Sequence, residues 1–163
     1  MNMSERWIRF LATGGGLGLS PFAPGTAGTL PGVALAVGLG FCGLGWLGQA
    51  AVAAVLVALA IPICDRAERL FGTKDDRRIV ADEYLTFPIC VLGLPWMEHP
   101  WLLALAFVTN RAMDVIKPPP ARKLQAVRGG AGIVLDDLFS TLYALALNHA
   151  LWAAWCRWGT GAA

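Results

Sequence analysis

Residues 128–137 of this chain, RGGAGIVLDD, combine the two features that decide its fold: a cluster of three glycines and two adjacent carboxylates. The glycines allow the backbone to come close to a neighbouring segment or to a ligand. Asp136 and Asp137 then precede residues 138–156, which contain no Asp, Glu, Lys or Arg. Because a carboxylate beside so much apolar sequence is costly, we expect it to have a cation partner.

The composition is that of a protein embedded in lipid. Of the 163 residues, 56% are hydrophobic and only 15% are charged, and the mean hydropathy is +0.57. Soluble domains carry about 25% charged residues. The net charge of +2, without a basic block interleaved with aromatics, argues against nucleic acid as a partner. The length fits one domain, residues 1–163.

Long uncharged runs predict an all-α, multi-pass membrane helical bundle. Residues 30–64 carry no charge, and one helix of that length would measure about 52 Å, whereas the hydrocarbon core is about 30 Å thick. The glycines within residues 43–48 therefore predict a break between two spans. The complete set of expected spans is 30–46, 49–66, 79–96, 100–116 and 136–156.

The N-terminal segment 14–29 contains six glycines and two prolines, which argue against a regular helix. Two interpretations are open. The segment is either a flexible loop or an ordered re-entrant loop, whose amides and whose hydroxyls on Ser20, Thr26 and Thr29 receive an anion at the start of the next helix. It carries no nucleotide-binding fingerprint.

Charge is distributed very unevenly across the expected spans. All thirteen bases except Arg157, and all eleven acids except Glu98, fall on one side of the membrane. Positive charge marks the cytoplasmic side. The sequence therefore predicts that the glycine-rich segment and the acids near the span ends meet at the cytoplasmic face.

Five carboxylates are the candidate chemistry of that face: Asp82, Glu83, Asp114, Asp136 and Asp137. Placed at bilayer depth, each would cost roughly 2.5–3.5 kcal/mol. They therefore need water, a metal, or cations, for which Arg111, Lys117 and Arg128 are available. An all-carboxylate site favours a hard ion, Mg²⁺ first, and a metal beside bases and a glycine loop suits a phosphate. A purely structural salt-bridge network remains the alternative.

Four segments in order resemble the bacterial phosphatidylglycerophosphatase A family. They are residues 19–28 (LSPFAPGTAG), the pair Asp82-Glu83, residues 111–120 (RAMDVIKPPP), and residues 129–137 with their paired aspartates. The resemblance implies an inner-membrane enzyme that removes the terminal phosphate of phosphatidylglycerophosphate with Mg²⁺, and so makes phosphatidylglycerol. It implies that the five carboxylates hold the metal, and that Ser20, Thr26, Arg111, Lys117 and Arg128 hold the phosphate.

Two other functions stay open at this point. One is a phosphatase for a different phospholipid or a polyprenyl phosphate. The other is a small membrane ion carrier, for which acids within the membrane are also expected. A carrier usually shows internal repeats, and none is visible here. The sequence carries no signal for the oligomeric state.

Overall fold

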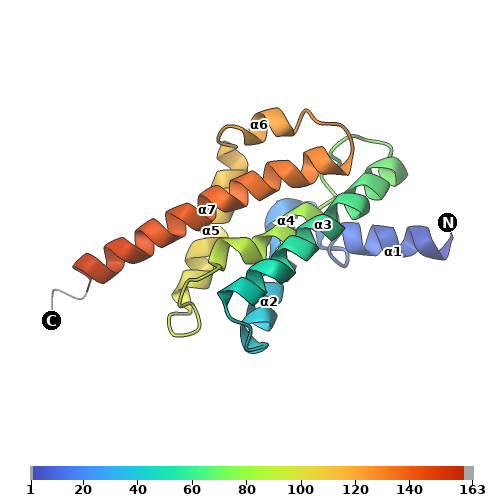
Figure 1. Ribbon diagram of the computed structural model, residues 1–163. Coiled ribbons are helices and arrows are strands. Elements are labelled where there is room, and N and C mark those ends of the chain that lie inside the picture. The colour runs from blue at the N-terminus through green and yellow to red at the C-terminus, as the bar shows by residue number, and fades with distance from the viewer. Residues whose placement is uncertain (1, 160–163) are drawn as a thin grey trace.

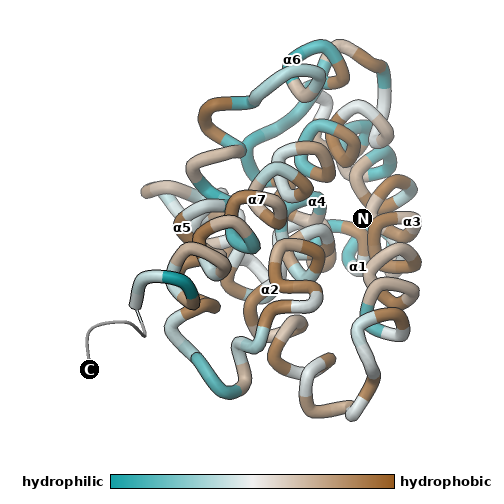
Figure 2. The backbone as a smooth tube through the Cα atoms, turned by 60° about the vertical axis from the view of Figure 1, so that its left-hand side comes forward, coloured by the Kyte–Doolittle hydropathy of each residue, from teal (hydrophilic) through white to brown (hydrophobic). Residues whose placement is uncertain are grey.

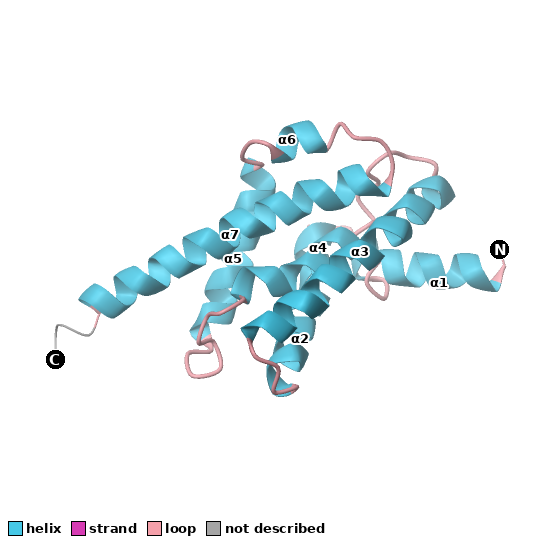
Figure 3. Ribbon diagram, viewed as in Figure 1, coloured by secondary structure: helices cyan, strands magenta, loops and turns pink. Residues whose placement is uncertain are grey.

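The computed structural model describes residues 2–159, and every regular element in that range is helical (Figures 1 and 3). The all-α prediction is confirmed for those residues. Two short 3₁₀ helices, η1 (Leu17–Leu19) and η2 (Phe87–Val91), accompany the α-helices. The α-helices are Met3–Ala12 (α1), Pro24–Phe41 (α2), Trp46–Phe71 (α3), Ala81–Thr86 (α4), Trp101–Ile116 (α5), Ala121–Leu124 (α6) and Gly130–Trp158 (α7).

The centre of the molecule is the short helix α4 with η2, which α2, α3 and α7 surround (Figure 1). Residues 79–91 are buried, apart from the half-buried Glu83. The predicted span 79–96 is wrong, because α4 has six residues and a helix of that length measures about 9 Å. Pro88 interrupts the backbone hydrogen bonding, and the chain continues as a 3₁₀ helix.

Two helices among the described residues are long and apolar enough to cross a membrane, α3 and α7. In α3, only 17% of the most apolar stretch is buried inside the protein, so most of this helix faces outward. Hydrophilic residues gather around α6 and the adjoining end of α3, whereas α2 and most of α3 are hydrophobic (Figure 2). The predicted break between the first two spans is confirmed, since α2 ends at Phe41 and α3 begins at Trp46.

The N-terminal glycine segment is partly helical, which corrects the expectation for residues 14–29. Gly14, Gly15 and Gly16 all have positive φ and form a turn, but α2 already begins at Pro24. A proline is favourable at the first position of a helix, where its missing N–H is not needed. Gly28 then packs so closely on Val80, the residue before α4, that a Cβ atom there would lie 2.4 Å from the Val80 Cβ.

Two of the three glycines before the paired aspartates, Gly130 and Gly132, are helical, and Gly129 precedes the helix with a positive φ. The last helix begins at Gly130, six residues before the predicted start at 136. A Cβ atom on Gly130 would lie 2.1 Å from the Ile61 carbonyl oxygen, and one on Gly129 would lie 2.8 Å from Asp65 Oδ1, so the segment that Gly129 and Gly130 approach is α3. Asp65 at that contact accepts a hydrogen bond of 3.4 Å from the Gly130 amide.

Helix α5 ends where the sequence predicted, directly before the proline run. Lys117 has left-handed backbone angles, φ 49° and ψ 68°, and terminates the helix. Pro118 follows and disfavours the α conformation for the residue before it. Arg111 and Asp114 therefore belong to the helix α5. Lys117 lies just after it, and its side chain leaves the backbone at the turn that ends the helix.

Candidate active site

Arg111 on α5 joins two of the predicted acids. Its Nη1 donates to Glu83 Oε2 at 2.6 Å, and its Nη2 lies 2.9 Å from Asp114 Oδ2. Thr29 on α2 also donates to Glu83 Oε2, at 2.9 Å. These side chains are mostly buried, so the interactions are screened little by water. Helices α2, α4 and α5 therefore meet at the Glu83 carboxylate.

Lys117 and Asp136 form a second ion pair, between the end of α5 and the start of α7. The ammonium lies 2.5 Å from Asp136 Oδ2. Burial would lower the pKa of Lys117, but the hydrogen bond to Asp136 and the charge of Asp114 outweigh it and raise that pKa above its usual value. The expected cation partner of the paired aspartates is thus confirmed for Asp136.

Asp82 and Asp137 lie deeper and have no ion pair among residues 2–159; each is only 7% exposed. The charges that act most on Asp137 are those of other acids, first Asp82 and then Asp114. The Oδ1 atoms of Asp82 and Asp136 are buried and have no hydrogen-bond partner within the described residues. Asp82 and Asp137 therefore face other acids rather than cations.

The donor set fits a hard divalent cation. Every acidic side chain in the cluster offers oxygen, the ligand type that Mg²⁺ prefers, and two of these oxygens are buried without a partner. As the side chains lie, no three His, Cys, Asp or Glu residues within the described range converge to hold a metal. A bound cation would require side chains such as Asp82 and Asp137 to turn toward it.

The first turn of α2 lies directly against the Glu83–Arg111 pair. A Cβ atom on Gly25 would approach Glu83 Oε1 to 2.5 Å and Arg111 Nη2 to 2.8 Å. No side chain caps this helix end, so its first amides lack a side-chain acceptor. Such a helix end favours an anion. The close approach explains why residue 25 is a glycine.

Three predicted phosphate-binding residues make no hydrogen bond or ion pair with the acidic cluster within residues 2–159. Ser20 donates to the Phe22 carbonyl at 2.7 Å, within its own turn. Thr26 is exposed, on the first turn of α2. Arg128 is exposed in the segment before α7 and makes no ion pair within the part of the chain that the structure describes. The structure brings Arg111 and Lys117 together with the acids, but not these three.

Sequence reasoning missed a layer of buried polar side chains beneath the acids. Thr141 Oγ1 donates to Asn110 Oδ1 at 3.0 Å and lies 3.4 Å from Thr86 Oγ1. The signal was present, because Thr86 and Thr141 follow Asp82 and Asp137 by four residues each. That spacing places a residue on the same helix face, one turn on. This hydrogen-bonded layer supports the side chains of Asp82 and Asp137, which lie one helix turn before Thr86 and Thr141.

The comparisons with known proteins agree with the four motifs. The model of the phosphatidylglycerophosphatase A family matches residues 10–152. Phosphatidylglycerophosphatase A of Escherichia coli is 31% identical over 95% of this chain and 88% of its own length. The Haemophilus influenzae protein of the same name is 34% identical over 88% of each chain.

A third relative carries a different name. A protein of Bacteroides thetaiotaomicron, with the provisional name phosphatidylinositol-3-phosphatase, is 34% identical over 93% of this chain and 94% of its own length. No solved structure matches the chain significantly. Because the family match covers most of the chain and includes all five acids, the chain belongs to the phosphatidylglycerophosphatase A family of lipid phosphatases.

Proposed function

We propose that this protein hydrolyses the terminal phosphate monoester of phosphatidylglycerophosphate and releases phosphatidylglycerol. Family membership and the names of the E. coli and H. influenzae relatives support the reaction. The observation in this chain that supports the reaction is the position of Arg111. Its guanidinium lies between buried acids and the uncapped start of α2, so cationic and amide donors stand beside carboxylates.

The phosphate-binding side of the site is built from Arg111, Lys117 and the first amides of α2. A guanidinium suits a phosphate because its donors form a planar fork. Lys117 remains charged beside Asp136, so it can neutralise a phosphate oxygen. Ser20, Thr26 and Arg128 are proposed to turn onto the headgroup when it binds, since they are exposed or half-buried.

The metal-binding side is the acidic cluster itself, in which we propose that Asp82, Glu83, Asp114, Asp136 and Asp137 hold Mg²⁺. A divalent cation supplies, when bound, charge neutralisation on the phosphate and a water of lowered pKa. The unpartnered oxygens of Asp82 and Asp136 support the assignment. One of the five carboxylates orients the attacking water, and the burial of the cluster keeps bulk water from competing.

The first experiment is phosphate release by the purified protein from a panel of lipid phosphates, with and without Mg²⁺. Phosphatidylglycerophosphate is expected to be the best substrate. The Bacteroides relative makes phosphatidylinositol 3-phosphate the second candidate, and both lipids are phosphate monoesters. Release only from the inositol lipid would replace the proposed substrate, and release from none would reject the function.

Sidedness is tested separately. We propose a multi-pass protein of the bacterial inner membrane with its site facing the cytoplasm, and the association of charge with one end of the fold supports this. In a variant without the native cysteines, Thr73→Cys should be protected from an impermeant thiol reagent in intact cells. Glu98→Cys should react. Both positions are exposed, so labelling at residue 73 from outside would reject the topology.

A further inference from the structure

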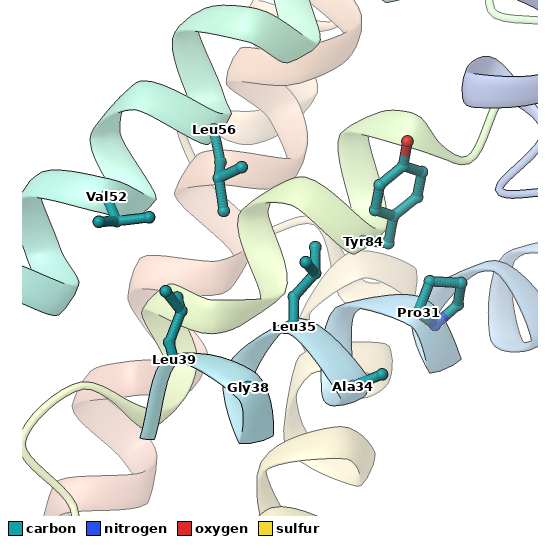
Figure 4. Close-up of a pocket in the computed structure, with 8 residues that line it drawn as sticks. All are labelled: Pro31, Ala34, Leu35, Gly38, Leu39, Val52, Leu56 and Tyr84. Carbon is teal, nitrogen blue, oxygen red and sulfur yellow. The ribbon is translucent and has the colours of Figure 1, made fainter. Parts of the chain in front are cut away.

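An apolar groove runs between α2 and α3, and nothing in the proposed chemistry uses it (Figure 4). Its volume is about 460 Å³. Pro31, Leu35 and Gly38 line it from α2, Val52 and Leu56 line it from α3, and Tyr84 lines it from α4. Its only lining side chain with a polar group is Tyr84, and that hydroxyl donates to the Leu11 carbonyl at 2.9 Å. The groove therefore presents hydrocarbon.

The groove opens where lipid is expected. One wall is α3, a candidate membrane-spanning helix whose apolar stretch is mostly exposed. In a bilayer, the neighbours of that surface are acyl chains and other helices. A helix with its side chains is about 10 Å wide and occupies about 420 Å³ per turn. A groove of this volume would therefore hold only about one turn of a partner helix. An extended hydrocarbon chain is narrower and fits along it.

The groove begins at the level of the acidic cluster. Tyr84 follows Glu83 on α4, and Pro31 lies two residues after Thr29, which donates to Glu83. From Pro31 the groove continues along α2 to Leu39, a length of about 12 Å. The residues of α2 that line it are turned about 130° round the helix from Gly25 and Thr29, at 100° per residue. The polar and apolar features thus occupy two different faces of one helix.

We propose that the groove between α2 and α3 binds an acyl chain of the phospholipid whose phosphate enters the acidic cluster. The proposal rests on the proposed function for the identity of that lipid. With the chain in the groove, the glycerol lies near Pro31 and the headgroup crosses the first turn of α2. Binding energy from the chain then positions a phosphate that the polar side chains alone would hold less firmly.

The sharpest variant is Gly38→Leu, because a Cβ atom on Gly38 meets nothing within 4 Å. Leucine favours the helix over glycine, so the side chain fills the groove without breaking α2. The matched control is Ala54→Leu, on the exposed far side of α3. For dioleoyl phosphatidylglycerophosphate, Gly38→Leu should raise KM about tenfold or more, whereas Ala54→Leu should not. For the deacylated headgroup, kcat/KM should be equal in the parent protein and in both variants.

A second experiment does not depend on turnover. Phosphatidylglycerol with a diazirine in one acyl chain is photolysed in vesicles that hold the protein. Leu35 and Leu56 should be labelled more than Val108, which is 62% exposed on α5. Gly38→Leu should lose that excess and Ala54→Leu should keep it. Equal labelling at all three positions, or crosslinks between two protein copies at the groove, would overturn the proposal.

The two experiments separate the groove from the reaction. Groove labelling without phosphate release from any lipid would reject the proposed function and leave a lipid-binding groove. Phosphate release with an unchanged KM in Gly38→Leu and no excess labelling would reject the groove alone.

Discussion

Two groups of charges lie toward the hydrophilic end of this molecule, and they are built differently. In the segment 65–78, two of the four acids each pair with one arginine: Asp65 with Arg69, and Asp76 with Arg78 at 2.7 Å. Around Arg111, three of the five carboxylates pair with two cations, Arg111 and Lys117, and Asp82 and Asp137 form no ion pair among residues 2–159. The first group is largely exposed at its arginines, and the second is largely buried.

The difference indicates which group serves stability and which serves chemistry. Exposed ion pairs contribute about 0–1 kcal/mol each and need no other explanation. Buried acids in excess of cations oppose folding, so a protein that retains them uses them for something else. A divalent cation and a phosphate-binding arginine would account for the imbalance.

The largest effect is expected from Asp137→Asn. The change keeps the size of the side chain and removes its charge, and it strands no cation because Asp137 has no ion pair among residues 2–159. Turnover should fall about 10²- to 10⁴-fold, while yield and thermal transition stay near those of the parent. Phosphate release per folded molecule is the measurement.

Glu98→Gln, at the opposite end of the charge distribution, is the control and should change neither property. Asp82→Asn, which also removes no ion pair among residues 2–159, should behave like Asp137→Asn in both properties. Glu83→Gln, Asp114→Asn and Asp136→Asn should lower turnover per folded molecule to a similar extent, but each also removes a partner of Arg111 or Lys117 and should therefore lower the thermal transition. If they lose stability but keep turnover per folded molecule, the acids are a scaffold and the contrast with segment 65–78 disappears.

Removal of metal should have a comparably large effect on activity. EDTA is expected to abolish phosphate release, and added Mg²⁺ to restore it, because the cluster offers only oxygen donors. A chelator selective for zinc should have little effect, since all five proposed ligands are carboxylates. Full activity in EDTA would rule out the metal mechanism.

Arg111→Ala should destabilise the fold strongly. The change leaves Glu83 and Asp114 buried without their shared partner, at a cost of about 3–5 kcal/mol in the free energy of unfolding. Arg78→Ala removes an exposed partner and should cost about 0–1 kcal/mol. Thermal transitions in detergent compare the two. Equal shifts would show that burial does not distinguish the two groups.

The smallest effect concerns acid. Hydrogen bonds from Arg78 lower the pKa of Asp76, although burial opposes them. A lowered folded-state pKa stabilises the protein above the unfolded value of about 3.9, and this contribution is lost as the pH falls through the folded pKa. The difference in thermal transition between the parent and Asp76→Asn should therefore shrink below about pH 4. A difference that is constant from pH 7 to pH 3 would contradict this.

Local signals in the sequence predicted much of the fold. The glycines after Phe41 marked the break before α3, and Pro118 marked the end of α5 at Lys117. The same signals misled where packing reversed their usual meaning. Gly28 and Gly130 lie inside helices because a neighbouring backbone or side chain leaves no room for a Cβ atom.

The motif segments named residues that contact one another, but not their arrangement. Glu83, Asp114 and Asp136 pair with two of the three expected cations, Arg111 and Lys117, whereas the role of the five acids as a metal site stays a prediction. Arg128 and the hydroxyls of Ser20 and Thr26 lie outside the cluster, whereas Thr29 joins it directly at Glu83. The polar layer of Thr86, Asn110 and Thr141 became visible only when three helices were placed together.

Composition, helix signals and motifs act within a few residues, so they were sufficient to predict a helical, largely apolar chain of a lipid phosphatase family. The position of residues 81–86 at the centre, rather than within a span, depends on packing between helices that are distant in the sequence. The same packing determines which acid meets which cation. Glu83 and Arg111 are 28 positions apart in the sequence. The first turn of α2 packs against both of their side chains, and it can come this close because Gly25 has no Cβ atom.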